Sequence, residues 1–177
     1  MPEERLDAWL GSPAVTTHHR RTAAASPERL WREATRVRLE DTRTLGRLVR
    51  WRIPGLRPEL TYHELFRAYP FTVLDEDEQL LVTGLCGRIW TLARDYPRLD
   101  GPEAFRDWDE PGTVRVLFGH WVEDAGDGRA ELGSEARVEP VDRRAGLRLR
   151  ALWTVIGGFE RLVGAEPLAL AARRAEA

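Results

Sequence analysis

Apolar and polar residues alternate along two long stretches of the chain. One face of these stretches would carry Val114, Val116, Phe118, His120 and Val122, and then Leu132, Ser134, Ala136 and Val138. Because successive side chains of a strand point to opposite faces, this spacing predicts two strands with one largely apolar face. The intervening "EDAGDG" supplies the glycines and aspartates of a hairpin loop. Residues 71–90, "FTVLDEDEQLLVTGLCGRIW", predict two more strands around an acidic turn.

Helical spacing appears on both sides of this strand region. "AAASPERLW" begins a helix after a strand over Val15 to Ala25, because Ser26 can cap the first turn and Pro27 suits its first position. A second helical piece follows over about residues 41–50, and a third begins at Thr61. From about Asp142 to the end, apolar residues recur on one broad side of a long helix. That helix is the only long apolar partner left to cover the sheet.

The motifs in this order resemble the SRPBCC (START-like, helix-grip) superfamily. They are "ASPERLW", "FTVLDEDEQLLVTGLCGRIW", "DEPGTVRVLF", "GRAELGSEARV" and the final "RRAE". More narrowly, they resemble an uncharacterised, polyketide cyclase/dehydrase-like subfamily. The resemblance implies an α+β helix-grip fold, in which a curved antiparallel sheet wraps around the long C-terminal helix. It also implies a cavity between sheet and helix, where relatives hold lipids, sterols, polyketides or plant hormones.

The resemblance covers about Val15 to Glu176, which predicts an N-terminal tail over residues 1–14 and a single START-like domain over residues 15–177. Two departures affect its polar positions. Ser134 and Ala136 stand where the subfamily pattern tends to have threonines, and the C-terminal helix lacks the usual tryptophan-proline-serine-arginine sequence.

Composition excludes several kinds of chemistry. All 27 basic residues are arginine, so the chain has neither a lysine for a Schiff base nor a phosphate-binding GxxxxGK[ST] loop. Its three serines lie outside any GxSxG elbow, which argues against a serine hydrolase. A net charge of -2 and a pI near 6.1 argue against a nucleic-acid binder.

The remaining composition predicts a cytoplasmic protein without a cofactor. Cys86 is the single cysteine, so no intramolecular disulfide can form, and a reducing compartment is compatible. We expect no signal peptide and no transmembrane segment, since apolar runs are short. We also expect no metal site, because adjacent His18 and His19 point to opposite faces of a strand.

Six residues are the candidates for lining the cavity. They are Arg88, Trp90, Phe118, His120, Trp153 and Ile156. Arg88 would anchor an anionic head group, or would instead pair with a carboxylate such as Glu135. His120 would act as an acid or base, or would instead be a hydrogen-bonded core histidine. Glu135 and Arg137 are interpreted as a solvated ladder on the outer face.

The leading hypothesis is a non-catalytic binding protein for a small, largely apolar ligand, lipid-like or polyketide-like. The first alternative is a cyclase or dehydratase that uses His120 in the same cavity. The second is a protein-protein interaction module, with a monomer and a homodimer both open. A stripe of arginines has two interpretations. It would make peripheral contact with a membrane, or it would be the solvated face of an amphipathic helix. The stripe comprises Arg36, Arg43, Arg47 and Arg50.

Overall fold

The computed structural model of the chain describes residues 1–47, 55, 57–91 and 96–177, with side chains excepted at 155–163. In this part, five strands form one antiparallel sheet in the order β1-β5-β4-β3-β2. The strands are β1 (Val15–Ala23), β2 (Thr72–Glu76), β3 (Leu80–Gly87), β4 (Val114–Gly126) and β5 (Arg129–Pro140). The helices are α1 (Pro2–Leu10), α2 (Pro27–Arg36), the 3-10 helix η1 (Leu39–Asp41), α4 (Tyr62–Arg67), α5 (Pro102–Arg106) and α6 (Arg143–Glu176).

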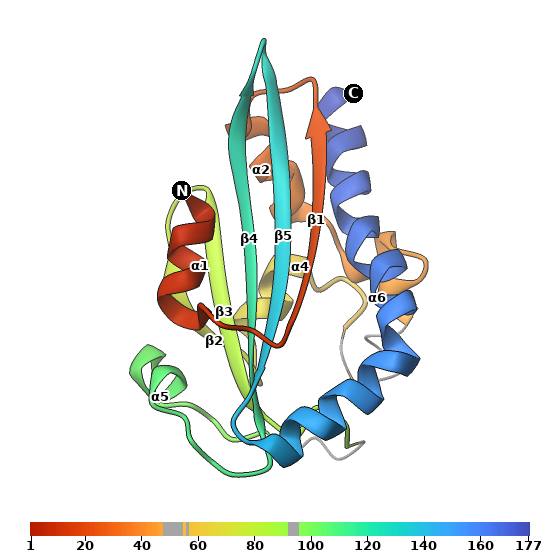
Figure 1. Cartoon of the computed structure of the whole chain (residues 1–177). Helices are drawn as coiled ribbons and strands as arrows, with labels where there is room; N and C mark the ends of the chain where they lie inside the picture. Colours follow the sequence, from red (N-terminus) through yellow and green to blue (C-terminus); the bar gives the residue numbers. More distant parts are fainter. Residues whose placement is uncertain (48–54, 56, 92–95) are drawn as a thin grey trace.

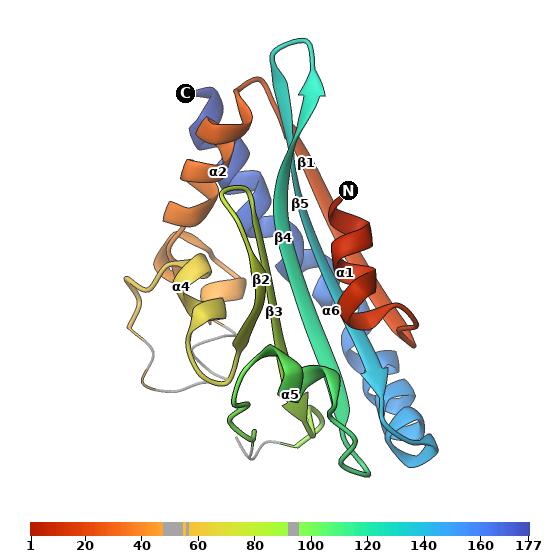
Figure 2. The same ribbon diagram turned by 90° about the vertical axis from the view of Figure 1, so that its left-hand side faces the viewer.

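The α+β helix-grip arrangement is confirmed, with a curved sheet and a long C-terminal helix. Figure 1 shows α6 as a bent helix that starts at one end of the sheet and then rises beside β1 and α2. Figure 2 shows α2 and α4 on the same side of the sheet as α6, while α1 and α5 lie on the other side. We call the side that faces α2, α4 and α6 the concave face.

The predicted helix starts are also confirmed. The Ser26 hydroxyl accepts a hydrogen bond from the amide of Arg29 over 3.3 Å, so it caps α2. The Thr61 hydroxyl accepts from the amide of Glu64, and the Glu64 carboxylate accepts from the amide of Thr61. This reciprocal pair fixes the start of α4, which carries Leu65 and Phe66 into the core.

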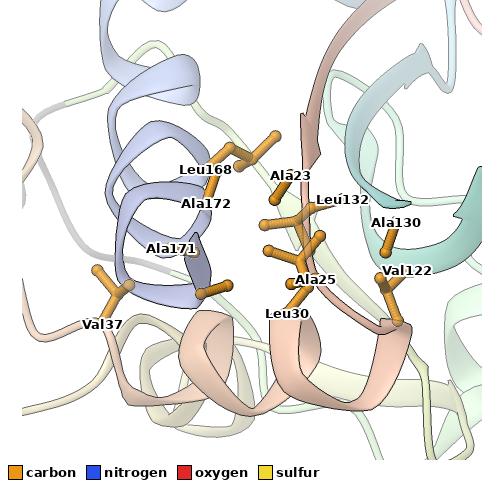
Figure 3. Close-up of a cluster of buried hydrophobic side chains, with 11 residues drawn as sticks. Ala23, Ala25, Leu30, Val37, Val122, Ala130, Leu132, Leu168, Ala171 and Ala172 are labelled. Atoms are coloured by element: carbon orange, nitrogen blue, oxygen red, sulfur yellow. The ribbon is translucent and has the colours of Figure 1, made fainter. Parts of the chain in front are cut away.

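Two apolar clusters occupy opposite ends of the concave face. In the first cluster, α2 and α6 pack together against the sheet, and Figure 3 shows Leu30, Leu168 and Leu132 converging there. In the second cluster, Leu149 near the start of α6 packs together with Val116 near the start of β4. The two clusters hold α6 to the sheet at both of its ends.

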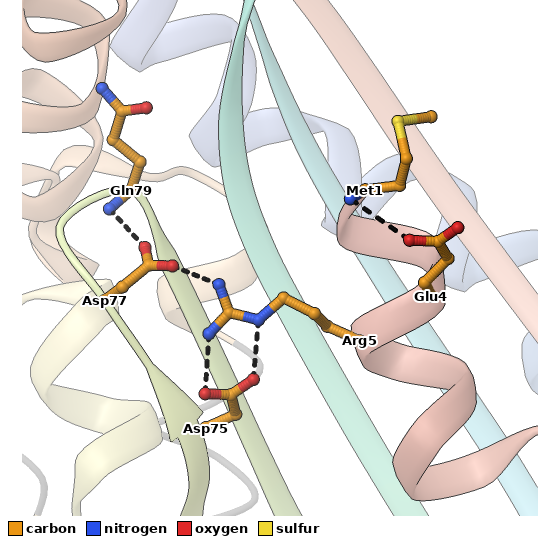
Figure 4. Close-up of polar contacts among 6 residues, drawn as sticks. All are labelled: Met1, Glu4, Arg5, Asp75, Asp77 and Gln79. Atoms are coloured by element: carbon orange, nitrogen blue, oxygen red, sulfur yellow. Dashed lines mark hydrogen bonds and ion pairs between the residues drawn. The ribbon is translucent and has the colours of Figure 1, made fainter.

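The first ten residues differ from the predicted tail, because they form α1 on the opposite face of the sheet. Leu6 and Leu10 are buried there, and Leu6 occupies the space where Gly119 has no side chain. Arg5 binds Asp75 through two hydrogen bonds of 2.6 and 2.7 Å and also pairs with Asp77, as Figure 4 shows. These apolar and ionic contacts explain why a short, charged segment is ordered.

The interpretation of Glu135 and Arg137 as a solvated ladder is wrong. Both residues are buried, at 7% and 6% exposure, because α1 covers them. The Arg137 guanidinium donates to Glu135 and Asp7, each over 2.5 Å, and to the carbonyl oxygen of Leu10. The alternation correctly placed them opposite the apolar face, but it gave no sign that a second layer covers that side.

The arginine stripe does not lie along one unbroken helix. Helix α2 ends at Arg36, and η1 intervenes before Arg43. The predicted second helix is described only as far as residue 47, so Arg50 lies outside the described residues.

Candidate functional site

The candidate site is the middle of the concave face, between the two apolar clusters. The strand register places Thr83, Phe118, Ala136 and Thr17 side by side across β3, β4, β5 and β1. We call these four residues the central row. The neighbouring row consists of Leu81, His120, Ser134 and His19. Helix α6 contacts the sheet near Trp153 and again at Leu168.

Phe118 and Ala136 remain only partly buried, although Phe118 lies on the central strand β4 and Ala136 on its neighbour β5. The residues that flank them on the same face are fully buried, with Val116 and Val138 at 4% exposure on one side. On the other side Leu132 is 3% exposed. The centre of the concave face is therefore less completely covered than its two ends.

Aromatic rings surround Phe118. Its ring centroid lies 5.0 Å from that of Phe66 and 5.6 Å from that of Phe71. Tyr62 and Phe66 are one turn apart on α4, and both contact the ring of His120. These contacts are of the edge-to-face or tilted kind that aromatic rings favour. Together they give one side of the site an apolar, polarisable surface.

His120 lies inside this aromatic cluster. Its Nε2 atom is 3.3 Å from the hydroxyl oxygen of Tyr62, and the residue is 7% exposed. Burial lowers the pKa of His120 to about 3, with a further lowering from nearby His63. Burial also lowers the pKa of His63, and Arg67 adds to that effect. The His120 imidazole is therefore neutral at physiological pH.

Three buried polar atoms have no hydrogen-bond partner within the described residues. They are the hydroxyl oxygens of Thr17 and Thr83 and the indole nitrogen of Trp90. Buried polar groups are nearly always paired, because leaving one unpaired costs about 1–3 kcal/mol. Thr17 and Thr83 form the two ends of the central row, so two of these atoms border the partly exposed Phe118 and Ala136.

A small cavity opens beside His120. It is lined by residues of α2, α4, α6 and the sheet, including Trp31, Tyr62, Phe66 and Leu168. Its volume of about 30 Å³ has room for about one or two water molecules.

Three of the six predicted site residues come together. Trp90, Phe118 and Trp153 are all partly buried against the apolar cluster at the start of α6. His120 lies next to Phe118 on the same face, in contact with Phe66. Ile156 falls among the side chains that are not described.

Arg88 lies apart from this group. Strand β3 ends at Gly87, so Arg88 and Trp90 do not share the face of a continuous strand. The Arg88 side chain is half exposed and lies 3.7 Å from the Glu110 carboxylate. This ion pair agrees with the structural alternative for Arg88, except that its partner is Glu110 and not Glu135.

Reactive and metal-binding groups give no further site in the described part of the chain. Burial raises the pKa of the Cys86 thiol to about 12, so this cysteine is not a ready nucleophile. Among the described residues, no cluster of three or more His, Cys, Asp or Glu is arranged to hold a metal ion. Likewise, none of the described helices is both long and apolar enough to cross a membrane.

Sequence reasoning missed Thr17, Thr83 and the α4 aromatic residues Tyr62 and Phe66. The alternation of β3 could have placed Thr83 on the face of Leu81 and Leu85. The contacts of Tyr62 and Phe66 with His120 depend instead on where α4 packs, and spacing within the sequence does not encode that position.

Comparisons with known proteins give only distant similarities. A scan of family models finds no match to this sequence, and a search of curated proteins finds none either. Among solved structures, the chain is similar to the hypothetical protein jhp0584 from Helicobacter pylori, with a TM-score of 0.40 and 8% identity over 96% of this chain and 93% of that one. It is also similar to TTHA0849 from Thermus thermophilus, with a TM-score of 0.35 and 10% identity over 91% of this chain and 97% of that one.

A third similar structure is Ara h 8.0201, with a TM-score of 0.29 and 9% identity over 91% of this chain and 97% of that one. At these TM-scores and identities, none of the three similarities assigns a function.

Proposed function

We propose that this protein binds a small, largely apolar ligand between the central row of the sheet and the middle of α6. One observation carries the proposal: Phe118 and Ala136 are partly exposed, whereas Val116, Val138 and Leu132 on the same face of β4 and β5 are buried. A sheet face that served only as core would be covered most completely at its centre. A lipid-like or a polyketide-like molecule fits a surface of this composition.

The surroundings of the central row support a ligand that is mostly apolar. Phe66, Phe71 and Phe118 offer ring surfaces to its body. The unpartnered hydroxyls of Thr17 and Thr83 offer a small number of polar contacts. Binding sites for small molecules commonly combine a predominantly apolar lining with a few polar groups that fix the ligand's orientation.

The alternative of a polyketide cyclase-like or dehydratase-like enzyme is less well supported. Such a reaction would need an acid or base that exchanges protons near the working pH. His120 was the candidate, but burial lowers its pKa to about 3, so protonated imidazole is scarce at neutral pH. Its Nε2 atom also lies 3.3 Å from the Tyr62 hydroxyl oxygen, so a hydrogen bond to Tyr62 engages this nitrogen. Both observations favour binding over catalysis by this residue.

The alternative of a protein-protein interaction module would need a continuous exposed apolar patch. Among the described residues, the large apolar side chains that are exposed are Met1, Tyr69 and Leu147. They belong to three separate parts of the chain, and this favours an internal binding site over a surface one.

Native mass spectrometry of the protein purified from cells, followed by organic extraction, tests the proposal. We expect an added mass on part of the protein and a small apolar molecule in the extract. The variant Ala136→Trp fills the centre of the concave face and should remove the added mass. Leu147→Trp is the matched control, because Leu147 is exposed on α6. Equal loading of wild type and Ala136→Trp would refute a site at the central row.

A further inference from the structure

We infer that the first part of α6 is a docking surface for an anionic lipid bilayer. At its centre is the side chain of Leu147, which is 55% exposed, and four exposed arginines surround it. The arginines are Arg143, Arg144, Arg148 and Arg150. We call these five residues the Leu147 patch. The inference does not rest on the proposed ligand site, so either one can fail while the other stands.

The spacing along the helix places the arginines around Leu147. Arg143 lies four residues before it, Arg144 three residues before it and Arg150 three residues after it. Residues three and four apart are neighbours on a helix surface, so these are the positions nearest to the leucine. Leu149 points the other way, since it is buried against the sheet. The patch is therefore an apolar side chain in the middle of a cationic face.

The positive charge of the patch is not neutralised by the rest of the described chain. Residues 143–159 contain these four arginines and no aspartate or glutamate. None of the four forms an ion pair with a carboxylate of the described residues, and Arg148 instead lies 5.8 Å from the ring centroid of Trp90. The carboxylate of Asp142, directly before the helix, accepts hydrogen bonds from two backbone amides over 2.6 and 2.7 Å. The guanidinium groups are thus available to an external anion.

The stability of α6 does not explain why arginines gather at its start. The N-terminus of a helix carries partial positive charge, so a cation in the first turn is unfavourable there and a carboxylate is favourable. Helix α6 begins with Arg143 and Arg144 and has no acidic residue in its first turn. Helix α2 shows the usual arrangement, with Glu28 in its first turn. The cationic start of α6 therefore favours a role outside the fold.

The location of the patch allows a flat surface to reach it. Figure 1 shows the start of α6 at the lower end of the molecule, far from α2, and Figure 2 shows it at a lower corner, outside the sheet. Beside Arg148, the ring of Trp90 is also partly exposed. Tryptophan is enriched at the level of lipid headgroups, because its ring is apolar and its N–H is polar.

The chemistry of the patch favours a bilayer over an acidic protein partner. The centre of a protein interface is mostly apolar and depleted in charged residues, whereas this patch has one large apolar side chain among four cations. Helices that lie on anionic membranes combine arginines at the phosphate level with apolar side chains that insert below it. In this arrangement Leu147 enters the acyl boundary while the surrounding arginines bind headgroup phosphates and carboxylates.

Co-sedimentation with large unilamellar vesicles tests the inference. One set of vesicles is phosphatidylcholine alone, and the other is phosphatidylcholine and phosphatidylserine in a ratio of about three to one, which gives a negative surface potential. We expect the protein to bind the anionic vesicles at low ionic strength and to bind the neutral vesicles much more weakly. Added salt should weaken the binding, because it screens exposed charges.

Two variants locate the binding on the patch. Arg143→Gln/Arg144→Gln should lower the partition coefficient about thirty-fold, since each arginine near an anionic surface contributes about five-fold. This variant should fold at least as stably as the wild type, because it removes cations from a helix N-terminus. Leu147→Ala should lower the partition coefficient about five-fold through the loss of inserted apolar surface.

Arg29→Gln/Arg32→Gln is the matched control. It removes the same charge from two exposed arginines of α2, at the other end of the molecule, and should leave the partition coefficient nearly unchanged. Equal weakening by the two double variants would overturn the inference, because overall charge would then direct the protein to the vesicle. Equal binding to both kinds of vesicle, or none to anionic vesicles at low ionic strength, would also overturn it. The last result would leave an acidic protein as the occupant of the patch.

Discussion

The Nε2 atom of His120 lies 3.3 Å from the hydroxyl oxygen of Tyr62, and the two rings meet edge to face. This contact joins the centre of β4 to the first turn of α4. It also explains how a polar ring is accommodated among Phe66 and Phe118, because the tyrosine hydroxyl gives the imidazole a hydrogen-bond partner. The pair therefore stabilises the packing of α4 on β4 and also forms one border of the proposed site.

The neutral state of His120 predicts a specific dependence of stability on pH. Its pKa is about 3 in the folded protein, below the value of 6.5 for a free side chain, so the unfolded chain binds the proton first. Stability is consequently complete above the unfolded pKa and falls as the pH drops below it. The contribution of this residue should approach about 1.4 kcal/mol per pH unit.

Urea unfolding at about pH 5 and pH 6 measures this slope. We expect His120→Phe to reduce the slope by nearly one proton. An unaltered slope in His120→Phe would show that His120 is protonated in the folded state and would reopen its role as an acid or base.

The buried pair of Arg137 and Glu135 predicts a large loss of stability when only one partner is removed. Their side chains are each 8% exposed, and the Arg137 Nε atom donates to Glu135 over 2.5 Å. Arg137→Met leaves the carboxylate buried without its partner, which should cost about 3–5 kcal/mol. The double variant Arg137→Met/Glu135→Leu should recover most of this loss.

Arg20→Met is the comparison for this prediction. Arg20 pairs with Glu3 and Glu131 on the same side of the sheet, but its side chain is 40% exposed, so its loss should cost only about 0–1 kcal/mol. Denaturant titration distinguishes the two cases. Similar small losses in Arg20→Met and Arg137→Met would mean that α1 does not keep water from the Arg137 pair.

Local sequence signals predicted the elements of the sheet and of the covering helices well. Ser26 and Thr61 cap helices where the sequence indicated, since a cap depends on residues within one turn. The hairpin turn lies at Gly126 and Gly128, whose φ angles of 78° and 71° glycine tolerates better than other residues. These features are determined by neighbours in the chain, so one sequence suffices to find them.

Features that depend on distant segments were missed. The burial of Glu135 and Arg137 requires α1, and α1 is held by Asp75, which is 70 residues from Arg5 in the chain. The packing of Trp90 against the cluster of Leu149 and Val116 similarly depends on the chain leaving β3 after Gly87. Alternation assigns a side chain to a face, but it does not say whether another element covers that face.

Two glycine-to-alanine substitutions should have opposite effects. A Cβ at Gly133 would lie 2.3 Å from the indole of Trp121, which is buried and rigid, so Gly133→Ala should cost about 1–3 kcal/mol. A Cβ at Gly146 in α6 meets only Pro140, at an ordinary 3.5 Å. Gly146→Ala should therefore add up to about 1 kcal/mol through helix propensity. Thermal unfolding of both variants checks the sign, and a stable Gly133→Ala protein would contradict the close packing of Trp121.

The hydrogen bonds of the Glu166 carboxylate predict a pH-dependent contact between α6 and the segment that follows η1. Its carboxylate accepts hydrogen bonds from the amides of Arg43, Thr44 and Leu45 over 2.5 to 3.0 Å. Burial raises the pKa of Glu166, but these amides and the charge of Arg43 outweigh that effect and lower it below 4.5. The folded state thus favours the charged form, so the stabilisation is present above that value and is lost as the pH falls.

The substitution Glu166→Ala should cost about 0.5–2 kcal/mol at neutral pH, as the loss of a helix cap does. The difference from wild type should shrink as the medium is acidified below the ordinary glutamate pKa of 4.5. Glu4→Ala is the control, because the Glu4 side chain is 80% exposed and pairs only with the N-terminal amine among the described residues. Amide hydrogen exchange locates the effect: faster exchange should be confined to Arg43, Thr44 and Leu45. A uniform loss of protection, equal at neutral and acidic pH, would contradict a charged cap at this position.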